Sequence, residues 1–250
     1  MKKSILITLF LLSGAVSAQR SFIRAAPPAF DYYMLSLSLA PAFCEENPGR
    51  AKRSRECGQL SKSDYLSHPL TLHGLWPSRL GRHHPSWCGN DQQEGGAFCR
   101  KESVSLSFPV RQRLENVMPG TADCLDRYEW AKHGTCTGMA ADAYFTRAIE
   151  LVDRANRALG RQISTSTGSE IPLVQLRANL SQTDPQLTEA TVFDCQYPRG
   201  GGHALLSEIR IYFERDPATG GPGKPLPFRS VGVRNYNSGC PAGRAYIDQP

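Results

Sequence analysis

Eight cysteines place the strongest constraint on how this chain can fold. They are spread from Cys44 to Cys240 in a chain of 250 residues, and their number is even. In an oxidising compartment they would form four disulfides, each of which stabilises a fold by roughly 2–5 kcal/mol. The order of the cysteines along the chain does not choose among the possible pairings. Whether they pair depends on the compartment, and the N-terminus bears on that question.

The N-terminal residues have the pattern of a secretory signal peptide. Lys2 and Lys3 precede an apolar run at 5–12, and small residues follow as far as Ala18. We therefore predict a signal peptide over residues 1–18 and a periplasmic or secreted protein. The apolar run is shorter than the roughly 18 residues needed to cross a bilayer, and no later segment approaches that length. No membrane insertion is expected.

The mature chain, residues 19–250, is weakly basic. The full sequence has 29 Lys and Arg against 23 Asp and Glu, a net charge of +6. Loss of Lys2 and Lys3 with the signal peptide leaves +4, which is weak evidence for a polyanionic partner. No internal repeat and no linker-like change of composition divides the mature chain. We expect a single domain that is a monomer.

Hydrophobic spacing indicates the α+β class. Apolar residues alternate with polar ones at 35–39 and again at 209–213, which predicts two half-buried strands. Helical spacing occurs at 110–118 and at 144–159, and Gly160 supplies a stop signal for the second helix.

The first segment with chemical potential runs Leu-Thr-Leu-His-Gly-Leu-Trp-Pro from Leu70 to Pro77. A short β-prone run leads into residues that break regular structure, so we expect His73 at the end of a strand, where Gly74 leaves room for a ligand. An imidazole has an ordinary pKa near 6.5 and is suited to proton transfer. The alternative is a hydrogen-bonded core histidine.

The second segment runs Tyr-Glu-Trp-Ala-Lys-His-Gly-Thr-Cys from residue 128 to residue 136. If it is helical as far as His133, then Glu129, Lys132 and His133 are spaced i, i+3 and i+4 and share one face. Trp130 would point away into the core. The alternative is a solvated Glu–Lys pair beside an uninvolved histidine.

Together the two segments supply two histidines, a cation and a carboxylate without metal-ligand spacing. RNA cleavage by internal attack needs such a set: a base removes the 2′-hydroxyl proton, an acid protonates the leaving 5′ oxygen, and a cation offsets charge in the transition state. DNA lacks the 2′-hydroxyl and should resist cleavage.

The two segments resemble the paired signature sequences of the ribonuclease T2 family, and the signal peptide and size are most similar to its bacterial periplasmic members. The resemblance implies a single disulfide-bonded α+β domain with a central antiparallel sheet flanked by helices. It implies an endoribonuclease without cofactor or metal, acting on single-stranded RNA with His133 as general base and His73 as general acid. Lys132 and Glu129 would stabilise the transition state. The first product would be a 2′,3′-cyclic phosphate, and slower hydrolysis would give a 3′-phosphate.

The resemblance also implies binding roles. Trp76 resembles a residue that packs against a nucleobase. Tyr128 replaces a histidine of many members and can hydrogen-bond a phosphate oxygen. Ser78 replaces an aspartate that reads a base, so we expect low base specificity.

The resemblance further implies two disulfides. It pairs Cys136 with a cysteine between the motifs, for which Cys88 is preferred over Cys99. A bridge between Cys195 and Cys240 is expected near the C-terminus.

Two other functions are compatible with parts of the sequence. The first is a secreted cationic RNA-binding protein without turnover, although a binder has no need of a paired acid and base. The second is a zinc-dependent phosphodiesterase that uses the cluster His83, His84, Cys88 and Cys99. This cluster lacks a paired spacing typical of zinc ligands.

Overall fold

A computed structural model describes residues 29–250 apart from 47, 82, 90–97 and 101. The predicted signal peptide, residues 1–18, lies outside the described residues. Within the described part of the chain, no helix has the length and apolarity needed to cross a bilayer.

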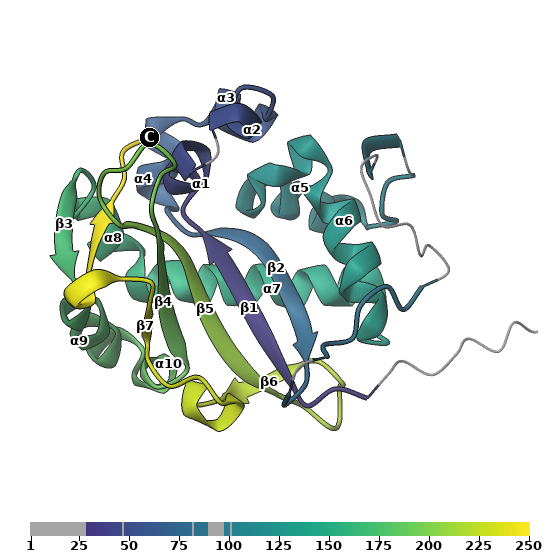
Figure 1. The fold of residues 1–250 in the computed structure, drawn as a ribbon. Coiled ribbons are helices and arrows are strands. Elements are labelled where there is room, and N and C mark those ends of the chain that lie inside the picture. The colour runs from purple at the N-terminus through teal and green to yellow at the C-terminus, as the bar shows by residue number, and fades with distance from the viewer. Residues whose placement is uncertain (1–28, 47, 82, 90–97, 101) are drawn as a thin grey trace, which may run out of the picture.

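The described residues form a mixed sheet in one α+β domain (Figure 1). Its principal strands lie in the order β2-β1-β5-β4-β7, and the first four are antiparallel to their neighbours, whereas β7 runs parallel to β4. Strand β6 pairs antiparallel with the last residues of β5, and β8 pairs antiparallel with β3 and, at one position, parallel with β5. The bounds are β1 Tyr32–Ser38, β2 Thr71–Ser78, β3 Ser169–Pro172, β4 Thr191–Gln196, β5 Leu205–Arg215, β6 Pro222–Pro225, β7 Asn237–Ser238 and β8 Arg244–Ile247.

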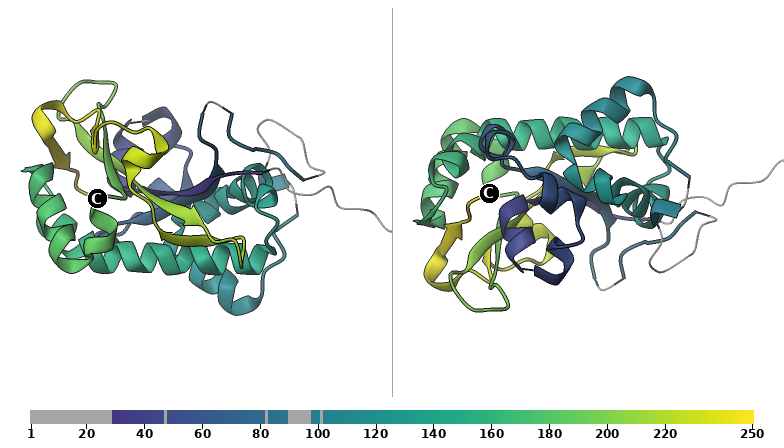
Figure 2. Two further views of the ribbon diagram at one scale, coloured as in Figure 1. Left: turned by 90° about the horizontal axis from the view of Figure 1, so that it is seen from below. Right: turned by 90° about the horizontal axis from the view of Figure 1, so that it is seen from above.

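Helices cover one face of this sheet and its ends. The longest, α7, crosses behind the central strands, and the view from below shows it lying along that face (Figure 2). Helices α5 and α6 lie beside β2, and the short helices α1 to α4 gather at one end of the strands (Figure 1). The bounds are α1 Ala40–Glu46, α2 Pro48–Ala51, α3 Arg55–Gln59, α4 Lys62–Ser67, α5 Phe108–Val117, α6 Leu125–Lys132, α7 Ala141–Ala155, α8 Arg161–Thr165, α9 Leu173–Thr183 and α10 Pro185–Thr188.

The strands are more completely buried than their alternating sequence predicts. Leu35 and Leu37 are fully buried in the main core as expected, but Ser36 between them is also fully buried. On that second face, a smaller apolar cluster that includes Tyr32 and Tyr212 covers one end of the strands. The polar residues of the second face therefore gather toward the other end.

The helix at 144–159 forms, but Gly160 does not stop it. After α7 the chain makes a π-helical turn at Asn156–Gly160 and continues as α8. Gly160 has ordinary helical angles, φ −56° and ψ −45°. An added Cβ would lie 3.3 Å from Asn156 Oδ1 and 3.5 Å from Pro69 Cδ. The glycine therefore leaves room for the Asn156 side chain, which is hydrogen-bonded to the Leu70 backbone just before β2, rather than ending a helix.

All eight cysteines form disulfides. The structure pairs Cys88 with Cys136 and Cys195 with Cys240, as the resemblance implied. The other two bridges join Cys44 to Cys57 and Cys99 to Cys124. Because Cys88 and Cys99 are both oxidised, neither supplies a thiolate, and the zinc site suggested for His83, His84, Cys88 and Cys99 is wrong.

Candidate active site

His73 lies within strand β2, at an irregularity in its pairing with β1. Ser36 pairs with Gly74 and Leu37 pairs with Leu72, so His73 is the extra residue of a β-bulge. A bulge re-aims a side chain relative to the regular pleat. The predicted strand end at His73 is therefore wrong, because β2 continues through Pro77. A proline is tolerated there because β2 is at the edge of the principal sheet.

Gly74 makes room for a contact inside the site, not for a ligand as predicted. A Cβ at this position would lie 2.3 Å from both Glu129 Oε2 and Trp76 Nε1. These two atoms form a hydrogen bond of 2.6 Å in which the indole N–H donates to the carboxylate. Only glycine leaves space for this hydrogen bond to pass so close to the β2 backbone.

Helix α6 presents the residues of the second motif as the spacing predicts. The His133 N–H donates to the Glu129 carbonyl oxygen at 2.9 Å, which completes the last turn. This turn brings the imidazole and the carboxylate of the pair onto one face, with His133 Nε2 4.0 Å from Glu129 Oε2. The alternative, a solvated Glu–Lys pair, does not form, because the Glu129 side chain is only 1% exposed.

Trp130 anchors α6 on the main core, as predicted. Its ring packs against Tyr144 and Phe145, with centroids 5.6 and 6.2 Å away. Gly134 permits this packing, because a Cβ there would lie 2.2 Å from Trp130 Cε3. The disulfide between Cys136 and Cys88 then ties the end of the motif to the segment after β2.

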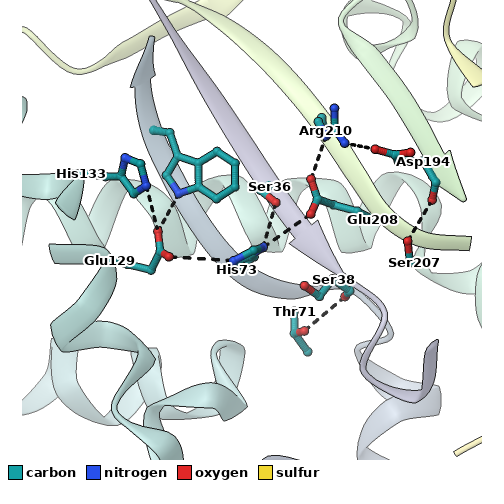
Figure 3. A network of polar contacts seen from close by, with 11 residues as sticks. Ser36, Ser38, Thr71, His73, Glu129, His133, Asp194, Ser207, Glu208 and Arg210 are labelled. Atoms are coloured by element: carbon teal, nitrogen blue, oxygen red, sulfur yellow. Dashed lines mark hydrogen bonds and ion pairs between the residues drawn. The ribbon is translucent and has the colours of Figure 1, made fainter. Parts of the chain in front are cut away.

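Glu129 lies between the two histidines (Figure 3). Its Oε1 is 3.9 Å from His73 Nε2, and its Oε2 is 4.0 Å from His133 Nε2. Trp76 completes the group: its ring stacks on His133 at 5.1 Å and meets His73 edge-on at the same distance. The structure thus gives the indole a role in holding the histidines and Glu129 together. Its contact with a nucleobase stays a prediction.

Lys132 and Tyr128 lie next to this group. The Lys132 ammonium donates to the Tyr128 hydroxyl at 2.8 Å. Both residues, with His73, Glu129 and His133, line a cleft of about 1050 Å³. The structure therefore brings all six predicted site residues, including Trp76, to one cleft.

The two histidines have opposite pKa shifts. Burial, reinforced by the positive charges of Lys132 and His73, lowers the pKa of His133 to about 3. Burial also disfavours the charged form of His73, but a hydrogen bond to Glu208 and the nearby negative charges outweigh it and raise the His73 pKa. His133 is thus neutral near neutral pH, and His73 keeps its proton to a higher pH than a free imidazole does.

Glu129 has a raised pKa. Burial raises it to about 7, and the charge of His73 and the Trp76 hydrogen bond oppose that shift. A buried carboxyl group between two imidazoles can accept hydrogen bonds or share a proton with them.

Two carboxylates near His73 were missed from the sequence. Glu208 on β5 and Glu56 on α3 both line the cleft. The only sequence signal for Glu208 is its place next to the alternating run at 209–213. No motif marks Glu56.

The cleft thus gathers two imidazoles with opposite pKa shifts, a carboxyl group and a lysine, a set of side chains suited to general acid–base chemistry. A sequence model of the ribonuclease T2 family matches residues 30–219. The chain belongs to the ribonuclease T2 family, as its two motifs indicated.

Individual relatives agree with this assignment. Ribonuclease I of Escherichia coli (strain K12) is 28% identical over 208 residues, which cover 75% of this chain and 76% of the relative. A ribonuclease of Aeromonas hydrophila is 28% identical over 69% of this chain and 68% of its own.

Solved structures show the same fold. RNase NT in complex with 5′-AMP has a TM-score of 0.62 at 14% identity and covers 89% of this chain and 100% of its own. Ribonuclease MC1 from bitter gourd seeds has a TM-score of 0.57 at 17% identity, with 87% and 100% covered. The predicted α+β class is confirmed.

Proposed function

We propose that this chain is an endoribonuclease that cleaves single-stranded RNA through a 2′,3′-cyclic phosphate, with low base specificity. The observation that carries the proposal is the pair of histidines on either side of Glu129, one neutral and one inclined to hold a proton. A reaction that removes one proton and donates another uses both states at once.

In the first step, His133 removes the proton of the 2′-hydroxyl, and the 2′ oxygen attacks the phosphorus. The bond from phosphorus to the 5′ oxygen breaks, and His73 gives its proton to that oxygen. Lys132 offsets the negative charge that develops on the phosphorane-like transition state, and Glu129 balances the imidazolium formed at His133. In the second step the histidines exchange roles: His73 deprotonates a water molecule, and His133 protonates the 2′ oxygen as the cyclic phosphate opens.

Two residues differ from those of many family members and bear on how the substrate is bound. Ser78 lines the cleft but is buried, and its hydroxyl donates to the Trp76 carbonyl oxygen at 3.2 Å, so it offers a base no charged group such as the aspartate of many members. Tyr128 offers a neutral hydroxyl next to Lys132, where it can donate to a phosphate oxygen.

The proposed location is periplasmic or secreted. Four disulfides support it, because disulfides persist in oxidising compartments. We propose that the enzyme acts there as a monomer without a cofactor or metal.

Product identification tests the proposed reaction. Defined dinucleotides are incubated with the protein in EDTA, and the products are separated over time. We expect a 2′,3′-cyclic phosphate first and a 3′-phosphate later, at similar rates for different bases. A dinucleotide with deoxyribose at the scissile position is the control, because it lacks the nucleophile. RNA binding without cyclic product would favour a non-catalytic binder, and loss of turnover in EDTA would contradict metal independence.

The pKa shifts predict a broad pH profile. His133 must be neutral, so kcat/KM should fall only as the pH drops toward its pKa of about 3. His73 must be protonated, so the alkaline limb should lie above pH 6.5, with Glu129 titrating in the same range. Lys132→Met should shift the acid limb upward, because the Lys132 charge lowers the His133 pKa. Rates on a dinucleotide across the pH range measure both limbs, and an acid limb at the ordinary imidazole pKa would contradict this assignment.

A further inference from the structure

A row of polar side chains crosses the second face of the sheet and ends at His73 (Figure 3). Glu208 and Arg210 on β5 pair with Ser38 and Ser36 on β1, so all four side chains lie on one face. Asp194 on β4 pairs with Glu208 and continues the row. These residues come from strands far from the two motifs in sequence.

His73 has a carboxylate on each side of its ring. On one side, Glu129 Oε1 lies 3.9 Å from Nε2. On the other side, Glu208 Oε2 lies 3.5 Å from Nδ1, and the Ser36 hydroxyl is 3.4 Å from the same nitrogen. The two ring nitrogens therefore face different partners, and only the Nε2 side faces the residues proposed for the chemical step.

Glu208 is itself held in place. Arg210 Nε donates to Glu208 Oε1 at 2.8 Å, which leaves Oε2 for His73. The Arg210 guanidinium also forms an ion pair with Asp194, whose side chain is 6% exposed. The Glu208 side chain is 21% exposed, so its charge is only partly screened by solvent.

We propose that Glu208 is a positioning residue for His73, held by Arg210 and Asp194. Its carboxylate accepts the Nδ1 proton of His73, directs Nε2 toward the substrate, and favours the protonated ring. This inference rests on the proposed function, because it concerns the general acid of that reaction.

The chemistry needs one tautomer throughout. After His73 gives the Nε2 proton to the leaving oxygen, the neutral ring must keep its proton on Nδ1. It then needs a free lone pair on Nε2 to accept a proton from water in the second step. A fixed acceptor at Nδ1 holds this tautomer in both steps. Glu129 lies on the Nε2 side of the ring and therefore cannot hold the proton on Nδ1.

The test replaces Glu208 in the intact, disulfide-bonded protein. Glu208→Gln removes the charge and keeps the size, and NMR titration of the His73 ring measures its pKa and tautomer without any substrate. We expect the His73 pKa to fall by about one unit, since an opposite charge at this distance shifts a pKa by roughly 1–3 units. The alkaline limb of kcat/KM, which reports the free enzyme, should move down equally, with kcat/KM about tenfold lower at pH values above both limbs.

The charges around His73 define the controls. Three carboxyl groups face His73, namely Glu129 from α6, Glu56 from α3 and Glu208 from β5. The ring of His133 also lies nearby. Glu214→Gln removes one negative charge from the exposed end of the same strand and should leave the His73 titration unchanged. Glu208→Asp keeps the charge and should leave the His73 pKa closer to the unsubstituted value than Glu208→Gln does. Thermal unfolding of each variant checks that the fold persists.

Several outcomes would overturn the proposal. They are an unchanged His73 pKa in Glu208→Gln, an equal shift in Glu214→Gln, or identical shifts in the Gln and Asp variants. If the unsubstituted protein fails to cleave RNA, the proposed function fails, yet the NMR titration still tests the contact between Glu208 and His73.

Discussion

His133→Ala and His73→Ala are each expected to lower kcat for dinucleotide cleavage by roughly 10²–10⁴-fold, the usual contribution of a positioned general acid or base. His133→Ala removes the neutral imidazole that takes the 2′-hydroxyl proton. His73→Ala removes the proton donor for the leaving oxygen. Single-turnover rates of cyclic phosphate formation measure the chemical step for both variants, with thermal unfolding to check the fold.

The leaving group separates the two roles. A nucleoside 3′-aryl phosphate has a leaving group of low pKa that departs without a proton, so His73→Ala should lose far less activity on it than on a dinucleotide. His133→Ala should remain impaired on both substrates, because the 2′-hydroxyl must still be deprotonated. His68→Ala is the matched control, because His68 is exposed and does not line the cleft. A kcat for dinucleotide cleavage within tenfold of that of the unsubstituted protein in either active-site variant would contradict the assigned roles.

The opposite pKa shifts of the two histidines follow from the surroundings of each ring, which the motifs alone do not reveal. The His133 side chain is 11% exposed and has positive neighbours, and burial is the main reason for its low pKa. The His73 side chain is 35% exposed and has carboxylates on either side. The sequence could predict two imidazoles near a carboxylate. Spacing alone could not predict which imidazole acts as base and which as acid, and that expectation came only from the family resemblance.

The sequence predicted the parts of the site that depend on local spacing. Glu129 and His133 share a face because they are one helical turn apart, and Trp130 points to the core for the same reason. The position of His73 within β2 was predicted less well. Whether a strand ends at a residue or bulges there depends on its neighbour β1, and the extra residue is visible only in the pairing register.

Residues that act across strands could not be predicted. Glu208 reaches His73 because β1 lies between β2 and β5, and this order is a property of the whole sheet. Gly160 resembled a helix stop because glycine commonly ends helices, but here a distant segment packs against it. In both cases a long-range contact, absent from local sequence, determined the role.

Gly74→Ala is expected to damage both stability and catalysis. The new methyl group would lie 2.3 Å from Glu129 Oε2 and from Trp76 Nε1, which are already in mutual contact. Either β2 shifts or the hydrogen bond of 2.6 Å breaks. Overpacking costs roughly 1–3 kcal/mol, and the loss of a hydrogen bond to a charged group costs roughly 1.5–3 kcal/mol more. We expect the free energy of unfolding to fall by about 3 kcal/mol, measured by denaturant titration.

Displacement of Glu129 and Trp76 by the new methyl group should lower kcat more than it raises KM. The reason is that these two side chains position the catalytic histidines, whereas most contacts with the substrate are made elsewhere. Gly58→Ala is the matched control: Gly58 lies in α3 with no atom within 4 Å of an added Cβ. That change should leave kcat unchanged and raise stability by about 0.4–1 kcal/mol, because alanine restricts the unfolded chain. If Gly74→Ala behaved like Gly58→Ala, the tight fit of β2 against the carboxylate would not be what holds Glu129 between the histidines.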